Sequence, residues 1–409
     1  MSRVKFRTLD DVDLSNKKVL VRVDFNSPID STGKILDDSR IKAHAVTLKK
    51  LVDMKAAVVV VTHQGRPGDP DFTTLEEHAS KLSNILGINV KFVNDVIGPT
   101  AINEIKNLRS GEVLMLDNLR LVSEELLEAE PETQAKTHLV RKLSPHFNFF
   151  IFDAFATAHR SQPSIVGFPV VLPSLIGELM KVELEALEKS LNSNEPPRLY
   201  VLGGAKVRDT LKIIEYLTKR RVAERILTSG LVGLTFHVAK GGRAGKKLLK
   251  FLEEKGLTTL IPTARKLILA GAPIDTPYDV KVLKEDGSVA EEPINVADGI
   301  PVDIGSYTIL MYSELIKDAS VVVMRGPAGY VEDPRFRTGT EELLKAALSS
   351  SAFVVIGGGH LGAFVKEPLR KNVHISTGGG ALLIAMSGEP LPALTALEIS
   401  TKKFFGGEL

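Results

Sequence analysis

The sequence contains no cysteine. This absence excludes disulfide bonds, thiolate metal sites and cysteine nucleophiles. An excess of charge of one sign is also missing, because 52 lysines and arginines stand against 50 aspartates and glutamates, and the formal net charge is only +2. No overall field therefore favours nucleic acid or an anionic membrane as a partner, and any anion site must be local.

Long hydrophobic runs are absent as well. No apolar stretch reaches the roughly 18 residues that are needed to span a bilayer. The segment from Met1 to Asp10 has no apolar signal core. Together with the lack of cysteine, which fits a reducing compartment, these features predict a cytoplasmic protein with no membrane partner.

The 409 residues exceed the length over which one hydrophobic core keeps growing, so two domains of roughly 200 residues are expected. Short β-branched runs alternate with helix-like segments, which is typical of parallel sheets with crossover helices. We predict an α/β fold of two doubly wound parallel-sheet (Rossmann-like) domains joined by a connector helix and hinge. The predicted strands are Val19–Phe25, Val58–Thr62, Val113–Leu116, Phe149–Phe152, Leu199–Leu202, Arg225–Thr228, Ser320–Met324, Phe353–Ile356 and Val373–Ile375.

The boundary between the domains is predicted from proline and leucine spacing. Gly167–Pro173 has the composition of a proline-rich turn, and Gly177–Leu191 has the leucine spacing of an amphipathic helix. We expect a first domain over residues 1–168, the connector helix and hinge over 169–191, a second domain over 192–392 and a tail over 393–409. The basic, glycine-rich stretch Lys240–Lys250 is interpreted as a solvated loop.

Cationic and polar side chains follow the predicted strands of the first domain. In open parallel sheets, ligands bind beyond the carboxyl ends of the strands. Arginine suits phosphate or carboxylate because its planar fork donates two parallel hydrogen bonds, so several converging arginines indicate a multiply charged anion. Any one of them also fits a surface ion pair, Asp24 also fits a turn cap, and His63 and His159 also fit packing roles. The candidates are Arg22, Asp24, Asn26, Arg40, His63, Arg66, Asn118, Arg120, His159 and Arg160.

The second domain carries three glycine-rich turns, each directly after a predicted strand. They are Gly203-Gly204-Ala-Lys206, Gly357-Gly358-Gly359-His360 and Ser376-Thr-Gly378-Gly379-Gly380. Glycine lets a phosphate approach the backbone closely, and a helix N-terminus favours negative charge. Three such turns in one domain predict a polyphosphate site.

Two other motifs are excluded by spacing. Gly357–Gly362 matches the dinucleotide fingerprint, but no carboxylate follows about 20 residues later. Gly241–Lys247 is one residue too short for a Walker A loop, and Lys247 stands where serine or threonine belongs. Neither a nicotinamide site nor a P-loop is therefore expected.

Taken together, the motifs resemble the phosphoglycerate kinase family over nearly the whole chain. The resemblance rests on Arg22-Val-Asp-Phe-Asn26, Arg40-Ile-Lys, His63-Gln-Gly-Arg66-Pro, Asn118-Leu-Arg120, Ala154-Phe-Ala-Thr-Ala-His159-Arg160, Leu179-Met-Lys-Val-Glu-Leu184, Gly203-Gly-Ala-Lys206, Gly326-Pro-Ala-Gly329 with Glu332, Gly357-Gly-Gly359 and Ser376-Thr-Gly-Gly-Gly380. It implies reversible transfer of the acyl phosphate of 1,3-bisphosphoglycerate to Mg-ADP, which gives ATP and 3-phosphoglycerate.

The resemblance also implies a role for each matching residue. The first domain would bind the triose, the second would bind the nucleotide, the tail would pack back on the first domain, and closure about the hinge would exclude water. Arg40 and Lys206 would be catalytic, on either side of the transferring group. Triose binding falls to Asp24, Asn26, Arg40, His63, Arg66, Arg120 and Arg160, and nucleotide binding to Gly203, Gly204, Lys206, Glu332, Gly357, Gly358, Gly359, His360, Gly378 and Gly379.

Three residues depart from the usual family pattern and resemble its archaeal branch. His360 stands where the family has an aspartate near the metal, Thr210 replaces a lysine and Arg325 replaces an asparagine. Mg²⁺ is expected with ADP or ATP, but its protein ligand is left open, and His360 either donates to a phosphate or packs. The partners are small molecules, and the expected state is a monomer, with a dimer as the alternative. Two functional alternatives remain: a kinase for another phosphorylated acid, and a nucleotide sensor without turnover.

Overall fold

The computed structural model describes residues 6–192, 195–243, 245–365 and 370–406. The chain forms two compact units. Unit 1 combines the chain up to Leu184 with the segment that starts at Pro390, and unit 2 is the continuous stretch Glu185–Glu389. The division lies inside the predicted connector helix and leaves residues 169–184 with unit 1. Among the described residues, every helix is too short or too polar to cross a bilayer.

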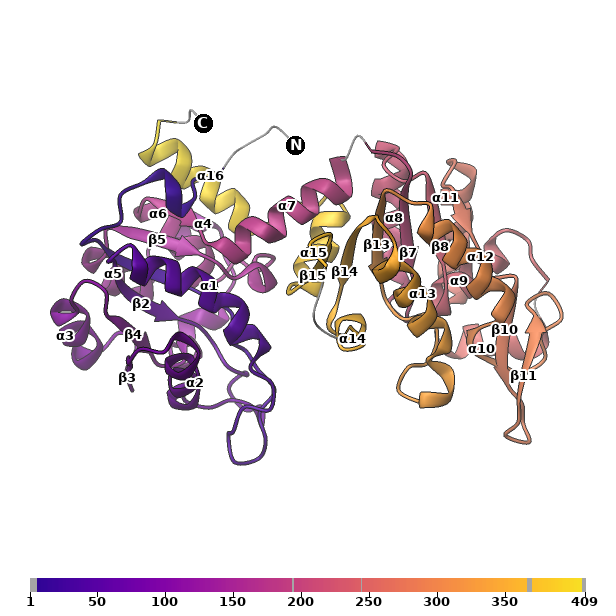
Figure 1. Ribbon diagram of the computed structural model, residues 1–409, viewed down its shortest axis with the longest axis horizontal. Helices are drawn as coiled ribbons and strands as arrows, with labels where there is room; N and C mark the ends of the chain where they lie inside the picture. Colours follow the sequence, from indigo (N-terminus) through magenta and orange to yellow (C-terminus); the bar gives the residue numbers. More distant parts are fainter. Residues whose placement is uncertain (1–5, 193–194, 244, 366–369, 407–409) are drawn as a thin grey trace. The chain divides into compact units, whose positions relative to one another are not determined.

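Unit 1 is built on a parallel sheet of six strands in the order β3-β4-β2-β1-β5-β6. Its central strands are almost fully buried, as expected for valine- and phenylalanine-rich runs that are covered on both faces. Figure 1 shows helices on both sides of this sheet. The strands are β1 (Lys18–Arg22), β2 (Ala57–Val61), β3 (Val90–Val93), β4 (Val113–Leu116), β5 (Phe149–Phe152) and β6 (Ser174–Ile176).

The helices of unit 1 follow the strands as crossovers. Helix α1 buries Ile41, Leu48 and Leu51 in the same core as strand residues Val19 and Val58. This stripe recurs every three to four residues, which gives the helix its apolar face. The main helices are α1 (Ser39–Asp53), α2 (Glu76–Leu86), α3 (Pro99–Asn107), α4 (Pro131–Gln134), α5 (His138–Leu143), α6 (Phe168–Val171) and α7 (Glu178–Asn192), whose first part belongs to unit 1.

Unit 2 repeats the plan with a second parallel sheet in the order β15-β14-β13-β7-β8-β9. The strands are β7 (Arg198–Leu202), β8 (Arg225–Thr228), β9 (Ile274–Asp275), β13 (Val321–Arg325), β14 (Phe353–Gly357) and β15 (Val373–Ser376). The helices are α8 (Val207–Arg220), α9 (Gly230–Ala239), α10 (Lys246–Glu254), α11 (Ile261–Leu269), α12 (Ser306–Lys317), α13 (Thr338–Ser349), α14 (Gly359–Gly362) and α15 (Gly379–Met386). The predicted fold of two doubly wound parallel sheets is confirmed.

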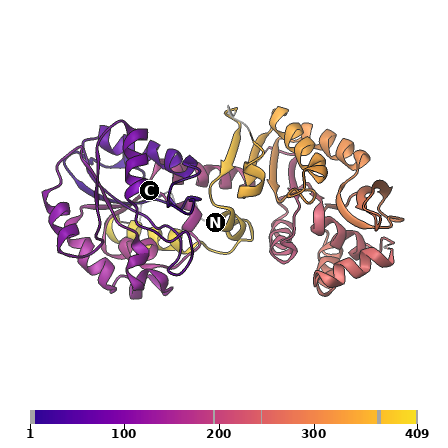
Figure 2. The ribbon, with the colours of Figure 1, turned by 90° about the horizontal axis from the view of Figure 1, so that it is seen from below.

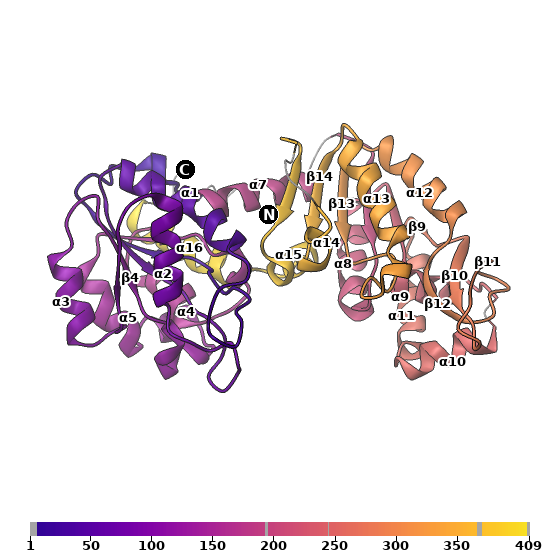
Figure 3. The same cartoon turned by 60° about the horizontal axis from the view of Figure 1, so that its bottom comes forward.

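A small antiparallel sheet also belongs to unit 2 and was not predicted. It pairs β10 (Asp279–Leu283) with β11 (Val289–Pro293) and β12 (Ile300–Ile304), and Figure 3 shows it beside α10. Only alternate residues of β10, Val280 and Val282, are buried. This alternation is the pattern of a strand with one buried face, but the run is only five residues long and was not singled out in the sequence.

The chain returns to unit 1 after unit 2. Helix α16 (Pro392–Phe404) packs on α6, and Figures 1 and 2 show it in yellow against segments from the first half of the chain. The Ser174 N–H donates to Ser400 Oγ over 2.9 Å, and Ser400 Oγ donates to Leu172 O over 3.0 Å. The Ala393 N–H donates to Ala158 O over 3.1 Å. Unit 1 is therefore assembled from two stretches of sequence that lie far apart.

Two local predictions were wrong. The segment Gly167–Pro173 is mostly helical, because a π-helical turn (Pro163–Gly167) runs directly into α6. Both Pro163 and Pro169 lie in the first turn of their helices, where the missing N–H costs no hydrogen bond. Lys240–Lys250 is a loop only in part, since α10 begins at Lys246 and buries Leu248.

Candidate active site

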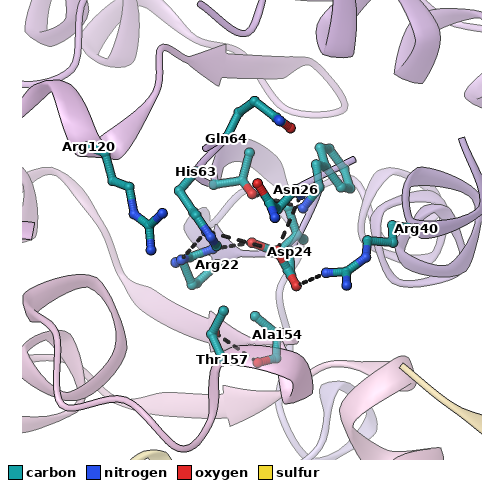
Figure 4. Close-up of polar contacts among 12 residues, drawn as sticks. Arg22, Asp24, Asn26, Arg40, His63, Gln64, Arg120, Ala154 and Thr157 are labelled. Carbon is teal, nitrogen blue, oxygen red and sulfur yellow. Dashed lines mark hydrogen bonds and ion pairs between the residues drawn. The ribbon is translucent and has the colours of Figure 1, made fainter. Parts of the chain in front are cut away.

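The predicted anion-binding residues of unit 1 follow the ends of four neighbouring strands. Strands β4, β2, β1 and β5 lie side by side and parallel, so their carboxyl ends meet at one edge of the sheet. Figure 4 shows Arg22, Asp24, His63 and Arg40 directed toward one another at this edge, with Arg120 on one side. The fold therefore brings together residues that are up to about a hundred positions apart in sequence.

Arg22, at the end of β1, is completely buried. Its Nε donates to Ser164 Oγ over 2.9 Å, and Ser164 Oγ donates in turn to Glu125 Oε1 over 2.5 Å. The guanidinium also lies 4.0 Å from Glu125 Oε1. Burial lowers the pKa of Arg22 and raises the pKa of Glu125, because both charged forms lose contact with water. The two opposite charges offset part of that cost for each other.

Asp24, in the loop after β1, forms an ion pair with Arg40 of α1. Asp24 is buried, whereas the Arg40 side chain, on the second residue of α1, is 38% exposed. Arg40 Nη1 donates to Asp24 Oδ2. The carboxylate thus orients a guanidinium that is partly exposed to solvent.

His63 follows β2 and is 3% exposed. Its Nδ1 lies 3.1 Å from Arg22 Nη2, and because a guanidinium only donates, Nδ1 accepts and the ring hydrogen is on Nε2. Burial, followed by the positive charges of Arg22 and three further arginines, holds the pKa of His63 well below its usual value. His63 is therefore a neutral donor through Nε2.

Asn26 and Arg120 are both fixed on the turn after His63. Asn26 Oδ1 accepts from the Gly65 N–H over 2.9 Å, and Arg120 Nη1 donates to Gly65 O. Arg120 Nε is buried without a hydrogen-bond partner. Burial, and then the charges of Arg160, Arg22 and Arg66, lower the pKa of Arg120 to about 10.

The electrostatic result is a local excess of positive charge. Arg66, exposed in the turn after β2, and the half-buried Arg160 both lie close enough to lower the pKa of Arg120. Among the residues that the structure describes, neither forms an ion pair with a carboxylate. Like charges at this spacing repel one another, so a bound polyanion would relieve that repulsion.

Acid should destabilise unit 1 through His78, a buried residue of α2. Its Nε2 donates to Gln64 Oε1 over 3.0 Å, and burial lowers its pKa from 6.5 to about 4. Between these values the unfolded chain binds a proton that the folded chain does not, so stability falls as the pH falls. We expect the free energy of unfolding of unit 1 to drop by about 2 to 3 kcal/mol from pH 7 to pH 4 on account of this group.

Denaturant titrations followed by circular dichroism at several pH values would measure this loss. His78→Gln keeps a donor for Gln64 but does not titrate, so its pH dependence should be shallower than that of the parent. Equal slopes in the two proteins would contradict the assignment to His78. His63 acts in the same direction and would account for part of the slope that remains.

In unit 2, three turns pack backbone against backbone beyond the ends of β7, β8 and β13. A Cβ on Gly203 would lie 2.4 Å from Pro327 O, and a Cβ on Gly326 would lie 2.2 Å from Gly203 O. Gly326 also has a φ of +75°, which side chains rarely adopt. Only glycine fits at these contacts, so glycine is required at positions 203 and 326 for the packing of the turns themselves.

A cavity of about 460 Å³ opens beside these turns. Its lining is mostly apolar and includes Leu231 and Val302, with Lys255, Asp303 and Glu332 as charged residues. Such a slot with few polar groups suits a flat heteroaromatic ring whose polar substituents point outward. Of the predicted nucleotide residues, Gly204 and Glu332 line this cavity.

The remaining predicted nucleotide residues lie at the ends of β7, β14 and β15. Lys206 is exposed at the residue before α8. Gly358 has a φ of +99° with open space around it, and a Cβ on Gly379, the first residue of α15, would lie 3.2 Å from Gly358 Cα. Gly378 precedes α15, whereas the side chain of His360 lies outside the part of the chain that the structure describes.

Of the three departures noted above, the structure places Thr210 and Arg325. Thr210 Oγ1 donates to Lys206 O over 3.1 Å, one turn back along α8. Arg325 ends β13 in register with Gly357, and burial lowers its pKa while the charge of Asp209 raises it. Arg325 therefore adds a cation to the end of the central strand, close to the glycine turns.

Several residues of the two sites were missed from sequence. The apolar lining of the cavity, such as Leu231 and Val302, comes from α9 and β12 and looks like ordinary core sequence. His44, whose Nε2 accepts from the Asp24 N–H over 3.1 Å, was not singled out in the sequence. No group of three or more His, Asp or Glu side chains that could hold a metal occurs among the described residues.

Two α/β units, one with an arginine-rich edge and one with a glycine-lined apolar cavity, define a phosphotransferase that acts on a small anion and a nucleotide. The chain belongs to the phosphoglycerate kinase family, since the family profile described as phosphoglycerate kinase matches residues 9–389. The resemblance predicted from the motifs is thereby confirmed.

Phosphoglycerate kinases of other organisms match this chain over nearly its whole length and theirs. Phosphoglycerate kinases of Sulfurisphaera tokodaii and Saccharolobus solfataricus are each 54% identical to this chain, over 96% and 98% of it and over 95% and 98% of their own lengths. The crystal structure of phosphoglycerate kinase from Pyrococcus horikoshii matches with a TM-score of 0.88 at 43% identity, covering 98% of this chain and 100% of that one. The enzyme from Coxiella burnetii has a TM-score of 0.78 at 29% identity, with 96% and 99% covered.

Proposed function

We propose that unit 1 binds the triose and unit 2 the nucleotide in reversible transfer of a phosphoryl group between 1,3-bisphosphoglycerate and ADP. The observation that carries this assignment is the cluster of arginines at one sheet edge of unit 1. Among the described residues, these arginines outnumber the two carboxylates that pair with them, Asp24 and Glu125. A triose with phosphate and carboxylate ends supplies the missing negative charge. The proposed triose residues are Asp24, Asn26, Arg40, His63, Arg66, Arg120 and Arg160.

On the nucleotide side, we assign the adenine to the apolar cavity and the ribose to Glu332. The phosphates would then lie along the turns that hold Gly203 and Gly204, Gly357 to Gly359, and Gly378 and Gly379, with Lys206 beside them. Support comes from the lining of the cavity and from the N-termini of α8 and α15, which follow these turns.

Phosphoryl transfer requires the protein mainly to position the two substrates and to neutralise charge. In one direction, a carboxylate oxygen of 3-phosphoglycerate attacks the γ-phosphorus of ATP, the bond to the bridging oxygen breaks and ADP leaves. In the other direction, a β-phosphate oxygen of ADP attacks the acyl phosphate. No proton needs to be removed from either nucleophile. Arg40 of unit 1 and Lys206 of unit 2 would each neutralise negative charge on the transferring group.

Mg²⁺ forms part of the proposal because it accompanies adenine nucleotides and would neutralise phosphate charge. The described side chains offer no cluster of carboxylates or histidines for it. We therefore assign no side chain as its ligand, and no step above depends on one.

Two alternative functions can be distinguished from this proposal by experiment. A nucleotide sensor without turnover is not favoured, since the similar curated proteins are named as kinases. A kinase for another phosphorylated acid would share the architecture and differ in the length of substrate that Arg120 and Arg160 accept. We further propose a monomer in the cytoplasm, where a glycolytic reaction takes place.

The test is steady-state turnover of the purified protein with ATP, Mg²⁺ and 3-phosphoglycerate, coupled to reductive removal of 1,3-bisphosphoglycerate. Turnover that requires all three components is expected. Turnover with a longer or shorter phosphorylated acid, and none with 3-phosphoglycerate, would support the alternative acid. A folded protein that binds nucleotide but turns over neither acid would support the sensor.

Gly358→Val should weaken nucleotide binding while leaving triose binding nearly unchanged. The position has open space, but a φ of +99° is strained for valine, and the branched side chain would stand where a phosphate approaches. We expect the KM for ATP to rise by about ten- to a hundredfold, or roughly 1.4 to 2.8 kcal/mol.

Gly271→Val is the matched control, because Gly271 has a φ of +88°, open surroundings and a position after α11 (Ile261–Leu269), and the cavity is lined by neither Gly271 nor its chain neighbours. It should carry a similar conformational cost without a change in KM. Parallel losses for both substrates in Gly358→Val would point to misfolding instead.

A further inference from the structure

His44 lies in the middle of α1 and is 2% exposed. Both of its ring nitrogens are engaged. Nε2 lies 3.1 Å from the backbone nitrogen of Asp24, and Nδ1 lies 3.0 Å from Asp153 Oδ2. The ring also packs edge-on against Phe25, with 5.7 Å between ring centroids.

The direction of these hydrogen bonds follows from the partners. A backbone N–H only donates, so Nε2 must accept from Asp24, and the ring hydrogen is therefore on Nδ1, where it is donated to Asp153. In this tautomer the ring is an oriented bridge between the backbone of the Asp24 loop and a completely buried carboxylate.

Asp153 extends the chain of contacts to the start of α7. Its Oδ1 accepts from the Met180 N–H over 3.0 Å. A Cβ on Gly177 would lie 2.2 Å from the same oxygen, so the turn before α7 closes directly over the carboxylate. Nearby, the Glu178 N–H donates to Thr47 Oγ1 over 2.9 Å, which fixes the first residue of α7 on α1.

We infer that His44 is a positioning residue for the triose site, which holds the backbone of Asp24 in place and links it through Asp153 to the N-terminus of α7. The inference rests on the proposed role of Asp24 in triose binding. Asp24 orients Arg40, so a shift of this backbone moves two of the groups that would contact the substrate. A change at Asp24 also reaches the first turn of α7 through two hydrogen bonds that are buried from water.

Two substitutions at His44 distinguish the hydrogen bond made by Nε2 from the hydrogen bond made by Nδ1. The glutamine amide reaches the position of Nε2, so His44→Gln keeps an acceptor for the Asp24 N–H. The shorter asparagine amide reaches the position of Nδ1, so His44→Asn keeps a donor for Asp153 and loses the acceptor for Asp24. Both remove the ring contact with Phe25, and asparagine leaves the larger gap because it is one methylene shorter than glutamine. The free energy of unfolding of both variants is therefore measured as well, since a role in packing alone would lower stability without a selective rise in the KM for 3-phosphoglycerate.

In turnover with ATP and 3-phosphoglycerate, His44→Asn should raise the KM for 3-phosphoglycerate by roughly five- to twentyfold, as the loss of one oriented hydrogen bond implies. The KM for ATP should not change. His44→Gln should stay within about twofold of the parent for both substrates. Equal KM values for 3-phosphoglycerate in the two variants would overturn the inference, whereas failure of the parent to turn over this acid would overturn the proposed function instead.

Hydrogen exchange of the parent protein gives a second test that needs no variant. Addition of 3-phosphoglycerate should slow exchange in peptides that cover Asp24 and, with it, in peptides that cover Gly177–Leu184. Slower exchange around Asp24 with no change in Gly177–Leu184 would break the proposed link to α7.

Discussion

Lys206→Ala should lower kcat by about two to four orders of magnitude, or roughly 3 to 5 kcal/mol of transition-state stabilisation. The residue is exposed where the first glycine turn enters α8, and its side chain forms no ion pair among the described residues. A cation so placed is available to the equatorial oxygens of the transferring phosphoryl group, over which charge is spread in the transition state. Steady-state kinetics in both directions would measure the loss.

The fold should survive this change, since the side chain makes no cap hydrogen bond. Lys212→Ala on the same helix is the control: its exposed pair with Glu389 is a surface interaction, and activity should be unchanged. A Lys206→Ala enzyme within a few-fold of the parent would remove this lysine from the mechanism. Loss of activity in both variants would point to a general effect on α8.

Arg22→Met should destabilise unit 1 by about 3 to 5 kcal/mol, because it leaves the buried Glu125 without its cation. Methionine fills much of the arginine volume, so the loss reflects charge and hydrogen bonding more than a cavity. All six tyrosines lie between Tyr200 and Tyr330, inside unit 2, and there is no tryptophan. Tyrosine fluorescence therefore follows the unfolding of unit 2 alone, whereas circular dichroism follows the unfolding of both units.

Two further variants give this prediction its controls. Arg225→Met breaks a half-exposed pair with Asp275 in unit 2 and should cost at most about 1 kcal/mol. Adding Glu125→Gln to Arg22→Met removes the unpaired charge and should recover a large part of the loss. A loss in Arg22→Met no greater than that in Arg225→Met would show that the buried pair contributes little.

The parallel sheets could be predicted from the sequence because their strands are continuous buried runs. Phe149–Phe152 and Arg225–Thr228 are strands with those bounds. The antiparallel sheet was missed because β11 is mostly exposed and carries only Val289 and Ala290 as apolar residues. Its stability comes from pairing with β10, which is a property of tertiary structure.

The candidate site divides in a similar way. Arginines after strand ends could be found because topology alone sends them to one edge of the sheet. Arg22 was predicted as one of these cations, but its buried partners Ser164 and Glu125 were not. His44 was not singled out. Whether a buried polar group supports a site depends on its partners, and Glu125 and Asp153 lie about a hundred residues away from them.

Because unit 2 is inserted between two stretches of unit 1, the order in which the chain is synthesised matters for its folding. The residues of unit 2 are continuous, so its core can be completed as soon as Glu389 has left the ribosome. Unit 1 has all six strands much earlier but lacks α16, and Ser174, Leu172 and Ala158 then have no partners from that helix. The part translated first is thus the part finished last, and the surface under α16 stays open to chaperones in the interval.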